Sequence, residues 1–257
     1  MSAQLSYGET AQAATPPTDE QAVRCQDVSG FSLFSTGAAG SAHVVAHRLL
    51  DQDRCELGHR LLGAWLEGCA GMGSDWVHLQ WHMAVFELEL GHWEAAFARF
   101  ERQILPAATT TEDALTDAPA LLWRLSLAAR RPIELPWQPV RATALARMRR
   151  PSSPYVELHN LLALAGAGDL TSLDQWLQKQ TPLARSRSEA LVARMAAALR
   201  AYAGGNFELA ATVLANVVLD IAVVGGSRAQ NRLFTQLAQA AQRQARRQVA
   251  VALLKVA

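Results

Sequence analysis

Apolar residues recur at helical spacing along most of the chain, and the pattern is clearest in residues 76–106, WVHLQWHMAVFELELGHWEAAFARFERQILP. In the first half of this segment one helix face carries Trp81, Ala84, Val85 and Leu88. Gly91 is typical of a helix end, and Pro106 closes the segment. We therefore expect two short helices that fold back on each other. Such a hairpin cannot bury both of its faces alone, so it needs neighbours of the same kind.

Similar patterns, punctuated by Gly and Pro, predict about a dozen helices and no convincing strand. Residues 1–40 are expected to be a mobile leader, and residues 41–257 a single helical-repeat domain. The other expected helices cover residues 41–50 with Ser41 as N-cap, 55–68, a stretch from a cap among Thr109–Thr111 to 131 around Pro119, the prolines at 132–139 to 150, 155–165, 170–179, 188–203, 207–223, 227–242 and 246–256.

One six-residue phrase recurs. Gly91–Ala96 (GHWEAA) matches Gly205–Ala210 (GNFELA), and Gly166–Leu170 is a weaker third copy. In the first two copies a Gly ends one helix, an aromatic residue fills the elbow, and an Ala allows two helices to approach closely. Phe100 and Leu214 fall at the same offset after that Ala. This order is typical of tetratricopeptide hairpins, so we predict an all-α fold of stacked, degenerate hairpins in a right-handed superhelix, an α-solenoid.

Composition and charge narrow the classes of partner. Half of the 257 residues are hydrophobic, so a sizeable core can form, and the net charge of +1 argues against binding nucleic acid by bulk electrostatics. The longest apolar stretch, residues 207–226, carries Glu208, Asn216 and Asp220, which argues against a membrane span. The first ten residues lack the features of a secretory signal. Three cysteines without metal-knuckle spacing indicate reduced thiols and a cytoplasmic location.

Four histidines form two matched pairs, His43 with His47 and His78 with His82, each four residues apart. This spacing places both rings on one helix face, as metal ligation requires. If the two helices pack side by side, the four imidazoles could converge. His159 is a candidate fifth ring, and Asp117 and Glu157 are carboxylates that could orient the rings. The alternative is that the histidines only pack or form hydrogen bonds, since neither pair has the Glu that follows the first His in a zinc protease.

The turn Gly225–Gln230 (GGSRAQ) is a second candidate site. Free backbone N–H groups at the start of a helix can hold an anion or a carboxylate. The alternative, which the residue types favour, is a plain turn between helices with Ser227 as N-cap.

Taken in order over residues 43–254, these motifs resemble the tetratricopeptide repeat protein 38 family, and the match is to its C-terminal part. The family patterns appear as H-x-x-A-H at 43–47, H-x-x-W-H-x-A-L-F-x-L-E-x-G at 78–91, D-x-x-x-L-L-W-R-L at 117–125, D-x-H as Glu157-Leu158-His159, and G-G-S-x-A-Q at 225–230. The chain departs from the family at Arg48-Leu49-Leu50, Phe100-Glu101 and Arg232, and it is expected to be a shortened relative.

The resemblance implies an α-helical, tetratricopeptide-like fold and a shared polar pocket, but it brings no established reaction. The leading hypothesis is a non-enzymatic helical-repeat protein, without a cofactor, that binds a peptide, protein or small-molecule ligand on its concave face. The residues at motif positions, and hence the candidate ligand-binding residues, are His43, His47, His78, Trp81, His82, Asp117, His159, Ser227 and Gln230.

Two alternatives stay open. The first is a metal-dependent or acid/base enzyme that uses the pairs His43/His47 and His78/His82 to hold a divalent metal, with Asp117 or Glu157 orienting the rings. The second is a structural subunit whose apolar faces complete a homodimer.

Overall fold

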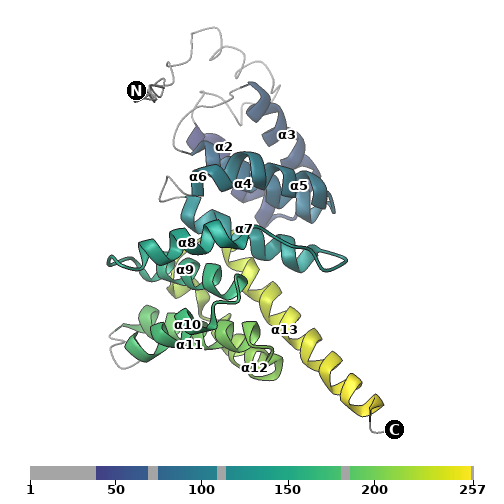
Figure 1. Ribbon diagram of the computed structural model, residues 1–257. Helices are drawn as coiled ribbons and strands as arrows, with labels where there is room; N and C mark the ends of the chain where they lie inside the picture. The colour runs from purple at the N-terminus through teal and green to yellow at the C-terminus, as the bar shows by residue number, and fades with distance from the viewer. Residues whose placement is uncertain (1–38, 69–74, 109–113, 181–185, 256–257) are drawn as a thin grey trace, which may run out of the picture.

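The computed structural model describes residues 39–68, 75–108, 114–180 and 186–255. Every regular element in these ranges is a helix, so the all-α prediction is confirmed (Figure 1). The expected leader up to residue 38 and the expected cap among Thr109–Thr111 lie outside the described residues. None of the described helices is both long and apolar enough to cross a membrane.

The N-terminal half is built around α4 (Trp76–Glu89). Each residue from Leu79 to Glu87 is buried, because α4 packs against its neighbours on several sides, and a helix that is apolar all round is stable only in such a position. The elements packed around it are α2 (Ala39–Asp51), α3 (Cys55–Gly68), α5 (Trp93–Arg99), the π-helix η2 (Phe100–Ile104) and α7 (Ala114–Ala128), and the short α6 (Leu105–Ala108) joins η2 to α7.

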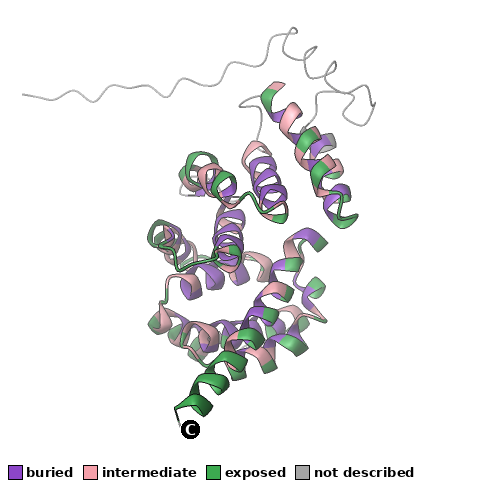
Figure 2. Ribbon diagram, turned by 90° about the vertical axis from the view of Figure 1, so that its right-hand side faces the viewer, coloured by how far each residue is buried: buried purple, intermediate pink, exposed green. Residues whose placement is uncertain are grey.

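In the C-terminal half most helices pack against their neighbours in the chain. The elements are α8 (Trp137–Arg147), α9 (Pro154–Gly166), α10 (Leu170–Gln180), α11 (Arg187–Ala203), α12 (Phe207–Val217), the 3-10 helix η4 (Ile221–Val223) and α13 (Arg228–Leu254). The long helix α13 begins against α7 and α2, then packs along α12, and its C-terminal end projects beyond the other helices (Figures 1 and 2).

Helix α7 belongs to two hydrophobic cores. Leu121, Leu122 and Leu125 pack into the N-terminal core, whereas Ala120 and Trp123 pack into the C-terminal one. A helix shared in this way is buried on most of its circumference. Its polar residues therefore lie between the two halves of the molecule, where they can act only on groups that the tertiary structure brings to them.

The recurring phrase corresponds to a recurring turn. Gly91, Gly168 and Gly205 have φ angles of +78°, +71° and +78°, a region of backbone conformation that favours glycine. In each turn the residue after the Gly donates its N–H to a carbonyl five residues back, as at a Schellman helix end. Ala96 and Ala210, expected to allow the close approach, are fully buried, and so are Phe100 and Leu214 at the same offset after them. The aromatic residues expected to fill the elbows, Trp93 and Phe207, are only partly buried.

The helix expected over 207–223 ends at Val217, and the separate 3-10 helix η4 follows it. Three further predicted boundaries are wrong. Helix α2 begins at Ala39, so Ser41 lies inside the helix and is not its N-cap. The helix after Gly91 does not close at Pro106 but continues to Ala108. A proline inside a helix removes one hydrogen bond and crowds the preceding turn, and the wider π-turn of η2 directly before it accommodates both effects.

The last correction concerns the C-terminus. Two helices were expected, at 227–242 and 246–256, but α13 runs without a break from Arg228 to Leu254. Residues 242–246 are Gln, Arg, Gln, Ala and Arg, which all favour helix, and no Gly or Pro interrupts them.

Candidate metal centre

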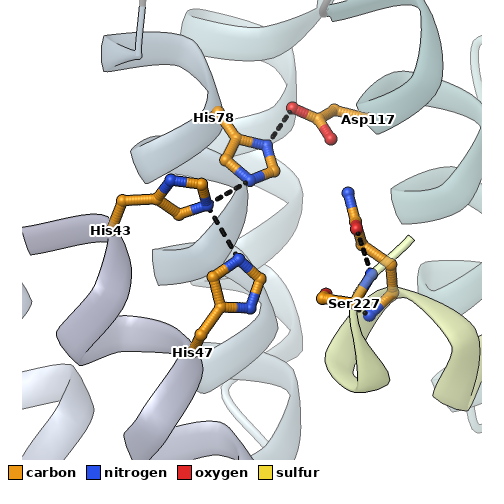
Figure 3. A network of polar contacts seen from close by, with 6 residues as sticks. His43, His47, His78, Asp117 and Ser227 are labelled. Carbon is orange, nitrogen blue, oxygen red and sulfur yellow. Dashed lines mark hydrogen bonds and ion pairs between the residues drawn. The ribbon is translucent and has the colours of Figure 1, made fainter. Parts of the chain in front are cut away.

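The two histidine pairs converge. One nitrogen each of His43, His47, His78 and His82 lies within 4.8 Å of the others, so the four rings surround a common point (Figure 3 shows three of them). His43 and His47 come from α2, and His78 and His82 from α4, which packs against α2. The i, i+4 spacing sets one face on each helix, and the packing of the two helices turns those faces toward each other.

Three of the four rings point the same nitrogen at one another. His43 Nε2 lies 2.7 Å from His47 Nε2 and 3.1 Å from His78 Nε2. Each of these contacts can hold at most one proton, and a neutral imidazole carries only one N–H. Lone pairs of several rings therefore face the centre of the cluster, an arrangement that a cation stabilises.

Asp117 of α7 determines which nitrogen of His78 carries no proton. Its Oδ2 lies 2.7 Å from His78 Nδ1 and is almost completely buried. A carboxylate only accepts hydrogen bonds, so Nδ1 of His78 carries the proton and Nε2 of the neutral ring offers its lone pair to the cluster. This is the carboxylate–histidine pairing that orients ligands around protein-bound metals.

His82 completes the group from its buried side. The ring is fully buried, and neither nitrogen has a hydrogen-bond partner among the described residues. Trp81, also fully buried, stacks on His78 with ring centroids 5.5 Å apart and meets His82 edge-on. A buried polar atom without a partner is costly, so a fourth ligand position at His82 would satisfy a nitrogen that the protein itself leaves unpaired.

Three of the four rings, those of His43, His47 and His82, are held neutral near pH 7. Burial and then the neighbouring histidines lower the pKa of His47 to about 4, and burial followed by His78 lowers the pKa of His43. The pKa of His82 is lowered well below its ordinary value, first by burial and then by the other three histidines and Arg124. Neutral imidazole is the form that binds metals, so protons compete only weakly with a metal ion for these three rings.

Two residues expected near the cluster serve other partners. His159 of α9 is outside the group of four, and its Nδ1 lies 2.8 Å from the carbonyl oxygen of Tyr155, so it donates to its own helix. Glu157, expected as an alternative orienting carboxylate, instead accepts from Trp176 Nε1 and from Ser152. Of the two candidate carboxylates, therefore, only Asp117 contacts one of the four rings.

Ser227, the N-cap of α13, lies near the cluster (Figure 3), and Gln230 follows it in the first turn of the same helix. They form a capping box: Gln230 N–H donates to Ser227 Oγ, and Ser227 N–H donates to Gln230 Oε1. These contacts are those of a helix cap, and a direct role of Ser227 and Gln230 in ligand binding stays a prediction.

Sequence reasoning did not single out Arg124 of α7. The side chain is buried, its Cζ lies 5.7 Å from the centre of the Trp81 ring, and its Nη2 donates to the carbonyl of Ala229 at 2.6 Å. The available signal was a lone charge inside the apolar run from Ala118 to Leu127. A charged side chain is rarely fully buried unless it is paired.

No family model matches this chain, and no solved structure matches it either. The chemistry of the site therefore has to be inferred from its own residues.

Proposed function

We propose that the protein binds one divalent transition-metal ion between His43, His47, His78 and His82, with Asp117 orienting His78. The observation that carries this proposal is the convergence of four imidazole nitrogens within 4.8 Å of one another. The bond from His78 to the buried Asp117 adds the outer support that metal sites use. Histidines that merely pack have no need of either feature.

The distances favour a tetrahedral ion. Zinc–nitrogen bonds of about 2.0–2.1 Å place neighbouring ligand nitrogens roughly 3.3 Å apart. The Nε2 contacts of 2.7 and 3.1 Å lie on the short side of that value, and no two of the four ligand nitrogens are more than 4.8 Å apart. Small ring movements would equalise them. Imidazole ligands suit Zn²⁺, Cu²⁺, Ni²⁺ and iron, and Zn²⁺ fits best with four-coordinate geometry.

A four-imidazole site has no open position, so an ion held by all four rings has a structural role rather than a catalytic one. The enzyme hypothesis requires that one imidazole leaves and that water takes its place. The half-buried rings of His43 and His47 are the candidates for leaving, since His82 is enclosed and His78 is anchored by Asp117. A site of this kind would activate a metal-bound water.

We further propose that the hairpins stack in the tetratricopeptide manner and that the chain is a relative of the tetratricopeptide repeat protein 38 family. The support is the shared turn at Gly91, Gly168 and Gly205 and the buried residues that follow it. On this scaffold the metal centre joins the first helix pair to the central one. An experimental structure in which the successive hairpins are not related by a similar rotation would contradict the proposal.

Metal content tests the metal proposal directly. Protein expressed in metal-supplemented medium and dialysed should carry about one equivalent of metal per chain by elemental analysis, and zinc titration of stripped protein should show one tight site. His47→Gln should lose most of this affinity, because one of four ligands is removed. His59→Gln is the matched control, since His59 is paired with His92 outside the cluster.

Two results would overturn the proposal: no tight site in the stripped wild-type protein, or equal metal affinity in His47→Gln and His59→Gln. A Co²⁺-loaded sample separates the structural role from the enzymatic one. Four-coordinate nitrogen ligation gives strong visible absorption, and an added water ligand weakens it.

A further inference from the structure

A cavity of about 470 Å³ lies where α13 crosses the N-terminal half of the molecule. We call it the α13 cavity; it lies between α2, α4, α7, η4 and α13, and its walls include Leu50, Val85, Arg124, Ile221, Ala222 and Arg232. Its volume is in the range of small-molecule sites. On α2 and α4 it begins one helical turn beyond His47 and His82, so it is a neighbour of the histidine cluster and not the same site.

The inner wall of the cavity holds a buried cation. Only 4% of the Arg124 surface is exposed, and among the described residues no carboxylate lies within ion-pair distance of its guanidinium. Its Nη atoms donate to the carbonyls of Ala229 and Gln230 and to Gln236, while its Nε–H has no partner in the described structure. A buried charge is costly unless an opposite charge compensates it.

Burial disfavours the charged form of the Arg124 guanidinium. Desolvation lowers the pKa of Arg124 to about 10, and the opposing attraction of Glu89 does not offset it. The protein therefore keeps a cation in a place that disfavours it, on the wall of an open cavity. An anion entering the cavity would gain a charge-assisted hydrogen bond and would relieve the cost of the buried charge.

We propose that the α13 cavity binds a small carboxylic acid with an apolar body, the carboxylate accepting from Arg124. The apolar body would lie against Leu50, Val85 and Ile221, which share the wall with Arg124. This site goes beyond the metal centre and does not depend on it, because the buried charge and the cavity exist without an ion.

A singly charged carboxylate fits the walls better than a phosphate. Asp51, Asp53 and Glu89 line the cavity together with Arg124, Arg228 and Arg232, so the lining has no excess positive charge to compensate a doubly charged anion. The apolar wall offers little to an ion without a body. These two features together select a short-chain or aromatic carboxylic acid over an inorganic anion.

Binding of hexanoate by the full chain tests the proposal, with hexanol and acetate as matched controls that lack the charge or the apolar body. Titration calorimetry should show hexanoate binding more tightly than either control. Arg124→Gln should weaken hexanoate binding by about tenfold or more, the loss expected for a charged hydrogen bond. Arg102→Gln, at an exposed arginine that donates to the Ala98 carbonyl and, within the described ranges, to no other group, should change nothing.

If Arg124→Gln does not fold, Ala222→Phe tests the proposal instead. Ala222 is exposed on the cavity wall, so a phenyl ring there fills the cavity without touching the core. It should abolish hexanoate binding. Equal binding of hexanoate and hexanol, or unchanged hexanoate binding in a folded variant, would overturn the proposal. Each titration is repeated on chelator-treated protein. Binding that requires the metal would show that the carboxylate ligates the ion, and would also overturn a separate site.

Discussion

His78 shows how a single contact decides the chemistry of a residue. Its spacing to His82 was visible in the sequence, but its bond to Asp117 joins residues 39 positions apart. That bond selects the tautomer, and the tautomer turns a lone pair toward the other rings. Without Asp117 the same four residues would be an ordinary group of buried imidazoles.

The lowered histidine pKa values predict that the metal-free protein loses stability in mild acid. The unfolded chain takes up protons below about pH 6.5, whereas the folded His47 does so only near pH 4. Stability is therefore complete above about pH 6.5 and falls as the pH drops toward 4. His47 accounts for at most about 3 kcal/mol, and for less in practice because solvent screens this half-buried ring. Urea unfolding of chelator-treated protein across this range measures the slope.

His47→Gln isolates the histidine contribution to that slope, since the carboxylates that also titrate in acid are the same in both proteins. The variant should lose less stability than the wild type between about pH 6.5 and pH 4. Parallel curves for the two proteins would mean that the folded His47 takes up its proton as readily as a free imidazole.

Any side chain at position 58 would overpack the N-terminal core. A Cβ at this position would lie 2.2 Å from the ring of the fully buried Phe86. Gly58→Ala should therefore destabilise the protein by about 1–3 kcal/mol, as overpacking does. Gly63→Ala on the same helix is the control, because its Cβ would meet only the flexible end of Met83 at 3.3 Å. The control should be neutral or slightly stabilising, since Ala favours helix. Thermal unfolding of the two variants gives the comparison.

At the scale of elements, the position of α4 depends on polar contacts as well as on apolar burial. Glu87 is buried on α4 and is paired by Arg99 of α5, whose Nη2 lies 2.6 Å from Oε1 and whose Nε contacts both carboxylate oxygens. Arg99 also donates to the buried Gln80. These bonds tie the two arms of the central hairpin together and set how α4 presents His78 and His82.

Arg99→Ala should be strongly destabilising, because it leaves the carboxylate of Glu87 buried without its partner. The expected loss is about 3 kcal/mol in the free energy of unfolding. Arg102→Ala, three residues further along and exposed, should cost less than about 0.5 kcal/mol. Chemical denaturation of both variants provides the measurement, and similar midpoints would mean that water reaches and solvates Glu87.

At the scale of the whole molecule, the two cores meet at α7, and α13 spans both halves. The histidine cluster and the α13 cavity lie close to this junction, with Asp117 and Arg124 of α7 contributing to one each. The C-terminal end of α13 is different. It projects into solvent and exposes the apolar residues Val249, Val251, Leu253 and Leu254 (Figure 2).

Removal of residues 246–257 should leave the fold nearly as stable as before, because the described residues of this end are exposed. The main loss is the bond from Gln248 Nε2 to the carbonyl of Gly205, worth about 1 kcal/mol. Thermal unfolding measures the change. Light scattering of both proteins tests the expected homodimer at the same time. A wild-type dimer that becomes a monomer on truncation would identify this end as the interface, and a wild-type monomer at all concentrations would exclude the dimer.

The sequence by itself determined the local structure. Apolar spacing and Gly–Pro punctuation located most helices, and the repeated GHWEAA and GNFELA phrases identified turns whose glycines do have positive φ. The i, i+4 spacing also placed each histidine pair on one face. These properties depend on residues within a few turns of one another, so they can be inferred from the chain alone.

Only the tertiary structure decided which distant groups meet. The packing of α2, α4, α7 and α13 decides three things. It turns the two histidine pairs toward each other, it brings Asp117 rather than Glu157 to the rings, and it buries Arg124 beside a cavity. Helix periodicity gives the direction of a side chain around its own axis. It does not give the partner, because packing angles and long-range contacts are set by the whole core and not by any one segment.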